Sequence, residues 1–306
     1  MPPTHICTQP TSPCITIDGT NDDEALRNAR IAFYGPSGIG PLHDTTSQAV
    51  TNLLTCLSPG GSLGRVMMVG HGSPGKIMTG SGAVANDLDK RIEFGNFNRW
   101  KITVRRLRSQ TTELTFCSCD TGADVKGAKL LMKVANHIEA TVSGFTGQIF
   151  IDATGTITCE PGGYWQHAYP GIDLPPVPAP IHHFEEVVDL RLKYGEEYRT
   201  VKIKDVRAVS FSDVGEGKLV FSLTGEAAQK LVGTINFAEP SEIDGAPLAL
   251  NTGTLRIKYL IDEKPDERTF TVYNDRLLFD QSTPNTFYFA SPDLAKLLDK
   301  YRSEFR

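Results

Sequence analysis

The chain has 306 residues, 40% hydrophobic content and a net charge of -5, enough apolar material for one large core or two ordinary ones, and we expect two domains. The even mixture of acidic and basic residues argues against a general nucleic-acid surface and against an anionic membrane partner. No apolar run reaches the roughly eighteen residues of a transmembrane helix, and no secretory signal is visible at the start. A cytoplasmic protein is the resulting expectation.

The cysteines are few and irregularly spaced for a chain of this length. Such spacing does not resemble a disulfide framework, so we expect free thiols in a reducing compartment. The six positions are Cys7, Cys14, Cys56, Cys117, Cys119 and Cys159.

The first elements follow from composition and periodicity. Residues 1–20 are rich in Thr and Pro and are expected to form a flexible tail that ends in a short strand at 14–17. The apolar run at 30–35 predicts the first firm strand, and residues 44–57 have helical periodicity. The Gly-rich turn at 35–40 lacks both the Gly-Lys-Ser/Thr ending of a phosphate loop and the full dinucleotide spacing, so no nucleotide site is expected there.

Two apolar runs end in small and polar residues that carry reactive side chains. Residues 65–70 lead into His71-Gly72, and residues 113–117 lead into Ser118-Cys119-Asp120. A buried strand that runs into such a turn brings its last side chains to the rim of a sheet, where ligands meet α/β proteins. We therefore expect an imidazole and a thiol at one rim, about fifty residues apart in sequence, as in caspases.

Gly70-His71-Gly72 after an apolar strand, with Ser118-Cys119 at the end of a second one, resembles the clan CD cysteine peptidases. This group includes caspases, legumains, gingipains, separases and the bacterial CHAT-type domains, and residues 114–122 are most similar to the bacterial members. The likeness covers roughly residues 28 to 160. It implies an endopeptidase on a caspase-like α/β fold, a mostly parallel sheet flanked by helices.

The resemblance also implies roles for individual residues. The Cys119 sulfur would attack the scissile carbonyl, His71 would act as acid and base, and the backbone N–H groups of Gly72 and Cys119 would form the oxyanion hole. A helix starting near Asp124 would favour a Cys119 thiolate near neutral pH. Cys117 competes for the role of nucleophile, but it lies deeper in the strand and fits a small buried hydrophobe better.

The substrate pocket of this fold lies beside the Cys strand and its neighbour. Asp120 and the segment Ser143, Gly144 and Phe145 are therefore expected to line or flank it. An acidic floor would suit an Arg or Lys side chain in a protein or peptide substrate. If Asp120 turns inward, it is expected to cap the following helix instead.

The rest of the chain predicts further elements and a domain boundary. A helix that buries Trp100, a helix at 125–140 and a strand at 141–145 complete alternating strands and helices, which indicates a mostly parallel sheet. Five prolines at 170–180 predict a semi-rigid spacer between a peptidase domain at 21–169 and a smaller α+β domain at 181–306. The α+β domain has predicted strands at 200–203, 219–223, 254–260, 269–273 and 286–289 and helices at 226–232 and 293–301.

Other functions stay open at this point. The histidine and the cysteine could be structural and never meet, and a zinc site of His71, Cys117 and Cys119 is disfavoured by the Cys-x-Cys spacing. A degenerate fold could act as a protein-interaction module: a filled rim with Cys119 buried would favour this, and an open groove would favour the enzyme. No cofactor is expected. The C-terminal domain could recognise a regulatory protein partner, present the peptidase or block it.

Overall fold

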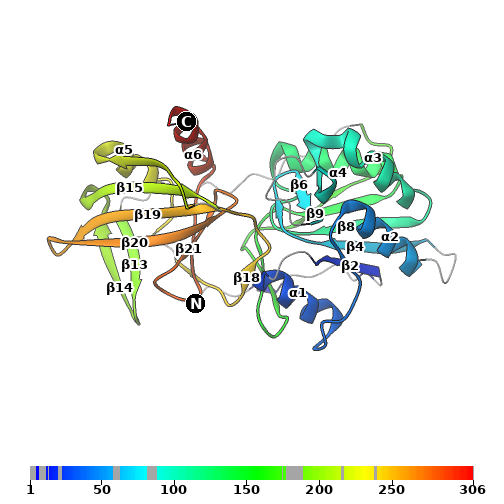
Figure 1. The fold of residues 1–306 in the computed structure, drawn as a ribbon, viewed down its shortest axis with the longest axis horizontal. Helices are drawn as coiled ribbons and strands as arrows, with labels where there is room; N and C mark the ends of the chain where they lie inside the picture. The colour runs from blue at the N-terminus through cyan, green and yellow to red at the C-terminus, as the bar shows by residue number, and fades with distance from the viewer. Residues whose placement is uncertain are drawn as a thin grey trace. The chain divides into compact units, whose positions relative to one another are not determined.

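The computed structural model divides the chain into two compact units (Figure 1): Met1–Pro180 with Asp244–Ala249, and Ile181–Ile243 with Leu250–Arg306. It describes residues 5–6, 12, 14–19, 23–57, 63–80, 88–173, 175–176, 189–214, 217–237 and 240–305. The end of the predicted proline spacer, 177–180, lies outside these residues. In the described part of the chain, no helix is long and apolar enough to cross a membrane.

A six-stranded sheet is the centre of the first unit, as far as the chain is described. Its order is β12-β9-β8-β4-β2-β3, and neighbours run parallel except β12 beside β9. The expected α/β architecture with a mostly parallel sheet is therefore confirmed. The strands are β2 (Cys14–Asp18), β3 (Leu42–His43), β4 (Gly64–Val69), β8 (Thr111–Cys117), β9 (Thr141–Phe145) and β12 (Trp165–Ala168).

Helices supply the apolar side chains that cover this sheet. In α4, seven buried residues recur at helical spacing between Gly127 and Ile138, so one whole face turns inward. Side chains of α2, α3 and α4 form one core with β4, β8 and β9. The helices are α1 (Glu24–Tyr34), α2 (Thr46–Leu57), α3 (Phe97–Val104) and α4 (Asp124–Ile138), with short 3-10 turns at Leu88–Lys90, Phe94–Asn96 and Arg105–Leu107.

Two small antiparallel sheets lie beside the main one. The chain after His71 forms a hairpin that belongs to the sheet β5-β6-β7 (Gly72–Ser73, Lys76–Met78 and Arg91–Glu93). The other sheet has the order β1-β11-β10-β18, with bounds His5–Ile6, Ile157–Cys159, Ile149–Ile151 and Ala246–Pro247. In Figure 1, β18 lies close to α1, although it comes from far along the sequence.

The strand predicted at 30–35 is wrong, because these residues form the end of α1. The helix begins at the N-cap Asp23, whose side chain accepts the N–H groups of Ala25 and Leu26. The apolar residues 31–34 are only half-buried, whereas a central strand would bury them. The strand predicted at 14–17 is confirmed as β2, and its pairing with β3 and β4 makes it part of the sheet instead of the predicted tail.

The prediction of free thiols is wrong for three cysteines. Cys14 in β2 and Cys56 in α2 form a disulfide, and Cys159 is disulfide-bonded as well. Cys117 and Cys119 are free and buried. Disulfides are typical of oxidising compartments, so the cysteines do not support the expected cytoplasmic location.

The second unit is built on an antiparallel sheet with the order β16-β15-β19-β20-β21-β22-β17 and a separate hairpin β13-β14. The predicted α+β pattern of strands and two helices is present here. The strands are β13 (Asp189–Tyr194), β14 (Glu197–Lys202), β15 (Val206–Asp213), β16 (Leu219–Thr224), β17 (Ser241–Glu242), β19 (Asn251–Ile261), β20 (Lys264–Tyr273), β21 (Leu277–Asp280) and β22 (Thr286–Phe289). The helices are α5 (Gly225–Val232) and α6 (Pro292–Glu304), with a 3-10 turn at Ile203–Asp205.

Candidate active site

The ends of β4 and β8 bring the predicted histidine and cysteine segments together. The two strands are parallel with Val69 opposite Cys117, and the N–H of Gly70 donates to the Cys117 carbonyl at 3.3 Å. A Cβ atom on Gly72 would lie 2.6 Å from the Cys119 carbonyl oxygen, which is too close for any side chain. Glycine at position 72 therefore lets the two chain segments approach each other directly.

Two backbone amides at these strand ends converge on one carbonyl oxygen. The N–H of Gly72 donates to the Leu248 oxygen at 3.1 Å, and the N–H of Cys119 donates to the same oxygen at 3.2 Å. These are the two amides predicted to form an oxyanion hole. Donors about 2.7 to 3.1 Å from one oxygen are the geometry that stabilises a tetrahedral intermediate, and this pair lies close to that range.

Cys119 itself is fully buried. Its Sγ atom accepts a hydrogen bond from the Ile149 N–H at 3.1 Å and donates to the Ile149 carbonyl at 3.4 Å. Burial, followed by the charge of Asp120, raises the pKa of this thiol well above its ordinary value. The expected thiolate near neutral pH is therefore wrong for this arrangement, because desolvation outweighs every group that favours the anion.

Cys117 occupies the position of a small core residue. It is buried at the end of β8, and burial raises the pKa of its thiol to about 12. Its carbonyl is engaged by Gly70 of the neighbouring strand. The predicted role as a buried hydrophobe agrees with this environment, and Cys119 is the cysteine whose amide contributes to the converging pair.

His71 faces a carboxylate that the sequence did not reveal as part of the site. Its Nε2 atom lies 3.4 Å from Oδ1 of Asp23, and its ring is nearly buried. Its Nδ1 atom is buried without a hydrogen-bond partner among the described residues. One ring nitrogen of His71 thus contacts a carboxylate, and the other has no hydrogen-bond partner among the described residues.

Asp23 is held as an ionised group. Burial opposes its charge, but the hydrogen bond and charge attraction of His71, with the N–H groups of Leu26 and Ala25, hold its pKa below the ordinary value. The signal for Asp23 was an acidic residue just before Glu24-Ala25-Leu26, a typical helix start. The mistaken strand at 30–35 hid this helix, and no local pattern places its N-terminus opposite His71.

Asp120 is buried next to Cys119 and turns inward. Its carboxylate accepts a hydrogen bond from the side-chain amide of Gln148, and its N–H donates to the Gly147 carbonyl at 2.8 Å. The predicted cap is wrong, because Ala123 precedes α4 and makes no side-chain cap bond. With its carboxylate bonded to Gln148, Asp120 is engaged by the protein itself.

The other predicted substrate-binding residues lie on β9. Ser143 pairs with Thr115, earlier in β8 than Cys117, and its hydroxyl bonds the Nδ1 atom of His167 at 2.7 Å. Gly144 packs on the backbone of Gly122. The Phe145 ring contacts the Trp165 ring at 5.3 Å between centroids, and its carbonyl accepts the Gly122 N–H at 2.9 Å. The structure therefore shows these three residues in contacts that support the sheet.

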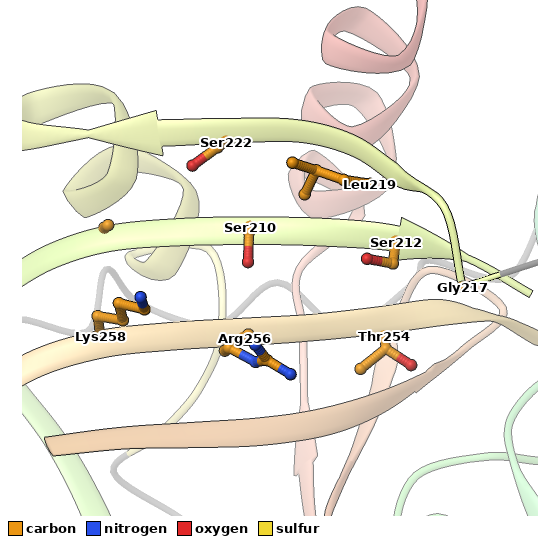
Figure 2. A pocket seen from close by; sticks show the side chains of 9 residues that line it. Ser210, Ser212, Gly217, Leu219, Ser222, Thr254, Arg256 and Lys258 are labelled. Atoms are coloured by element: carbon orange, nitrogen blue, oxygen red, sulfur yellow. The ribbon is translucent and has the colours of Figure 1, made fainter.

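The second unit contains a shallow, polar depression on its sheet, of about 440 Å³ (Figure 2). It is lined by Ala208, Ser210, Ser212, Gly217, Leu219, Ser222, Thr254, Arg256 and Lys258. Arg256 Nε lies 3.8 Å from Oε1 of Glu267, and Lys258 Nζ lies 3.9 Å from its Oε2. The Glu267 carboxylate therefore offsets part of the positive charge of these two side chains. The lining has hydroxyls and cations but no pair of nucleophile and base.

No protein-family model, curated protein or solved structure matches this chain. Among the described residues, no group of three or more His, Cys, Asp and Glu side chains could hold a metal ion. His71, Cys117 and Cys119 therefore do not gather in the arrangement that the zinc alternative requires.

Proposed function

We propose that the protein is a cysteine endopeptidase of the caspase-like type and that the buried Cys119 is its nucleophile. The observation that carries the proposal is the convergence of the Gly72 and Cys119 amides on the Leu248 carbonyl oxygen. Two N–H groups from separate strand ends that bind one peptide carbonyl, beside a free cysteine and a histidine, are the parts that acyl transfer requires.

The chemistry follows from these groups. His71 takes the proton of the Cys119 thiol, and the sulfur forms a bond to the scissile carbonyl carbon. The two amides stabilise the negative charge on the carbonyl oxygen, and removing one such donor typically costs about 2.7 to 4 kcal/mol of barrier. His71 then gives its proton to the leaving amine. Water, deprotonated by His71, hydrolyses the resulting thioester and releases the second product.

Asp23 acts in this scheme as the group that positions His71. Its contact with Nε2 leaves Nδ1 as the nitrogen that exchanges protons, and its negative charge stabilises the imidazolium that forms during the reaction. Fixed by two backbone N–H groups at the start of α1, the carboxylate provides a rigid support for the ring.

A second candidate function is a non-catalytic protein-interaction module. The burial of Cys119 and its raised pKa favour it, because a covered, protonated thiol is unreactive. The buried Cys119 meets the condition stated for the interaction module, and the converging amides are the reason for proposing the endopeptidase. The convergence of two backbone amides on one carbonyl oxygen, next to a free cysteine and a histidine, is what favours the endopeptidase.

Two thiol reagents distinguish these functions. A peptidyl chloromethyl ketone needs the oxyanion site and the imidazole, whereas iodoacetamide needs only an accessible thiol that can ionise. We expect the rate of peptidyl labelling at Cys119, read by intact mass, to fall by about 100-fold in His71→Ala, in line with the contribution of an acid–base group. Labelling should disappear in Cys119→Ala and persist in the matched control Cys117→Ala. A peptidyl labelling rate that is the same with and without His71 would overturn the endopeptidase and leave the interaction module as the remaining candidate.

A further inference from the structure

The segment Asp244–Ala249, which we call the strap, leaves the second unit and joins the first. By its contacts it belongs to the first unit, while the residues on both sides of it belong to the second. Its neighbours are anchored there: the N–H of Ile243 donates to the Asn285 carbonyl at 2.9 Å, and the N–H of Leu250 donates to Oδ1 of Asn274 at 3.1 Å. The strap is therefore a loop tethered at both ends.

The strap binds by its backbone, as an added strand. Its β18 pairs antiparallel with β10, with Pro247 opposite Phe150, and the N–H of Leu248 donates to the Ile149 carbonyl at 2.9 Å. Ala249, the next residue, forms a parallel bridge with Gly72. Addition of a strand to a sheet edge is one of the ways in which proteins bind extended peptides.

The register of the strap is that of a substrate. A peptide that is to be cleaved must place the carbonyl of its scissile bond on the oxyanion donors, and the Leu248 carbonyl accepts both of them. The bond between Leu248 and Ala249 thus lies in the scissile position. The Leu248 side chain, fully buried, takes the place of the substrate residue before that bond.

Ile149 links the strap to the covered thiol. Its carbonyl accepts both the Leu248 N–H and the Cys119 thiol, and its N–H donates to Cys119 Sγ. The sulfur is thus hydrogen-bonded to β10 while the strap occupies the amides. This arrangement holds a substrate-like peptide without activating the nucleophile.

We propose that the strap is a built-in substrate mimic that keeps the peptidase latent, and that substrates present Leu or a similar apolar residue before the scissile bond. This inference rests on the proposed function. The Arg or Lys preference expected from Asp120 is replaced, because the Asp120 carboxylate is bonded to Gln148. Tethering gives the strap an effective concentration in the millimolar range, so that free substrates compete poorly until it leaves.

The test displaces the strap in the full-length protein. Leu248→Asp puts a charge where the side chain is fully buried, and the milder Leu248→Ala removes only apolar contacts in case the first variant does not fold. The matched control is Leu219→Asp, the same exchange at an exposed leucine of the second unit. Circular dichroism checks folding, and iodoacetamide and acetyl-Ala-Pro-Leu chloromethyl ketone report on Cys119.

We expect iodoacetamide labelling of Cys119 to rise by about tenfold or more in Leu248→Asp and less in Leu248→Ala, with no change in Leu219→Asp. If iodoacetamide labelled Cys119 at the wild-type rate in both folded Leu248 variants, the proposal that the strap blocks the thiol would be overturned. The proposed enzyme would still be supported by a peptidyl reaction that depends on His71. A rise with iodoacetamide but a peptidyl reaction that ignores His71 would support the strap as a cover and overturn the enzyme. If Leu248→Ala reacted faster with an Ala-Pro-Arg reagent than with an Ala-Pro-Leu reagent, the proposed preference for an apolar residue before the scissile bond would be overturned.

Discussion

At the scale of single residues, the site combines a neutral thiol with an ionised carboxylate. Burial raises the pKa of Cys119, whereas Asp23 keeps a lowered pKa because His71 and two backbone N–H groups stabilise its charge. A neutral thiol is a poor nucleophile, so the proposed reaction requires proton transfer from Cys119 to His71 once the strap has left. Asp23 is then the residue that decides how well the imidazole is placed.

Replacement of Asp23 by Asn tests that role. Asn caps helices about as well as Asp, so at pH 7 we expect only the small loss of stability that comes from removing the Asp23 charge. The His71-dependent labelling of Cys119 should fall by about tenfold to 100-fold, less than the roughly 10⁴-fold loss known for a buried triad carboxylate, because Asp23 is partly exposed. An unchanged rate and pH profile would show that the contact only supports the helix.

The Asp23 carboxylate also makes the stability of the protein depend on pH in the acidic range. The pKa of Asp23 in the folded protein lies below the ordinary 3.8. Its contribution to the free energy of unfolding is therefore complete above about pH 4 and is lost as the pH falls through the folded pKa. Asp23→Asn should therefore lose less stability than wild type on acidification below about pH 4. Denaturant titrations of both proteins at pH 5 and pH 3 measure the difference.

His43 gives a second pH dependence with the same sign and a different window. Burial lowers its pKa from 6.5 to about 3, and its Nδ1 atom hydrogen bonds with Thr16 at 2.9 Å. Between these pH values the unfolded chain binds a proton that the folded chain does not, so stability should fall on acidification by about 1.4 kcal/mol per pH unit. In His43→Asn, whose amide can keep the Thr16 contact, urea titrations should not show this loss of stability between pH 6.5 and pH 3. If the free energy of unfolding fell equally steeply with pH in both proteins, the prediction would be contradicted.

At the scale of elements, local patterns predicted most of the first unit. The apolar runs of β4 and β8 and the periodicity of α2 and α4 are long enough to identify strand or helix directly. The strand prediction at residues 31–34 was wrong because a short apolar stretch is compatible with either a strand or a helix. Here the residues continue a helix that begins at the N-cap Asp23. The disulfide of Cys14 and Cys56 was missed because pairing depends on the packing of α2 on β2.

That disulfide should contribute measurably to stability. It joins residues 42 positions apart, and a loop of this length restricts the unfolded chain by about 4 kcal/mol in the entropy model. We expect Cys56→Ser to lower the free energy of unfolding by about 2 to 4 kcal/mol in denaturant titrations. Thr55→Ser, at a neighbouring exposed position of the same helix, is the control and should stay near wild type.

At the scale of the whole molecule, the chain crosses between its units more often than the sequence indicates. The His71 and Cys119 segments could be predicted to meet, because parallel strands bring their carboxyl ends to one edge. The strap could not be predicted, since Asp244–Ala249 is short, has no periodicity and is surrounded by strands of the second unit. The place where such a loop binds depends on the tertiary fold and cannot be predicted from local sequence.

This connectivity predicts that the stability of the second unit controls access to Cys119. Arg268 and Asp280 form an ion pair at 2.6 Å in the core of that unit, with 5% and 0% of their side chains exposed. Arg268→Met leaves the Asp280 carboxylate buried without its partner, which costs about 3 to 5 kcal/mol. Because both ends of the strap are anchored in this unit, the loss should also free the strap.

We therefore expect Cys119 in Arg268→Met to react with iodoacetamide at a lower urea concentration than in wild type. The control is Lys296→Met, which breaks the exposed pair with Asp293 and should cost at most about 1 kcal/mol. If Cys119 became reactive at the same urea concentration in all three proteins, opening of the site would depend on the first unit alone. A shift confined to Arg268→Met would instead make the second unit the element through which a signal could release the strap.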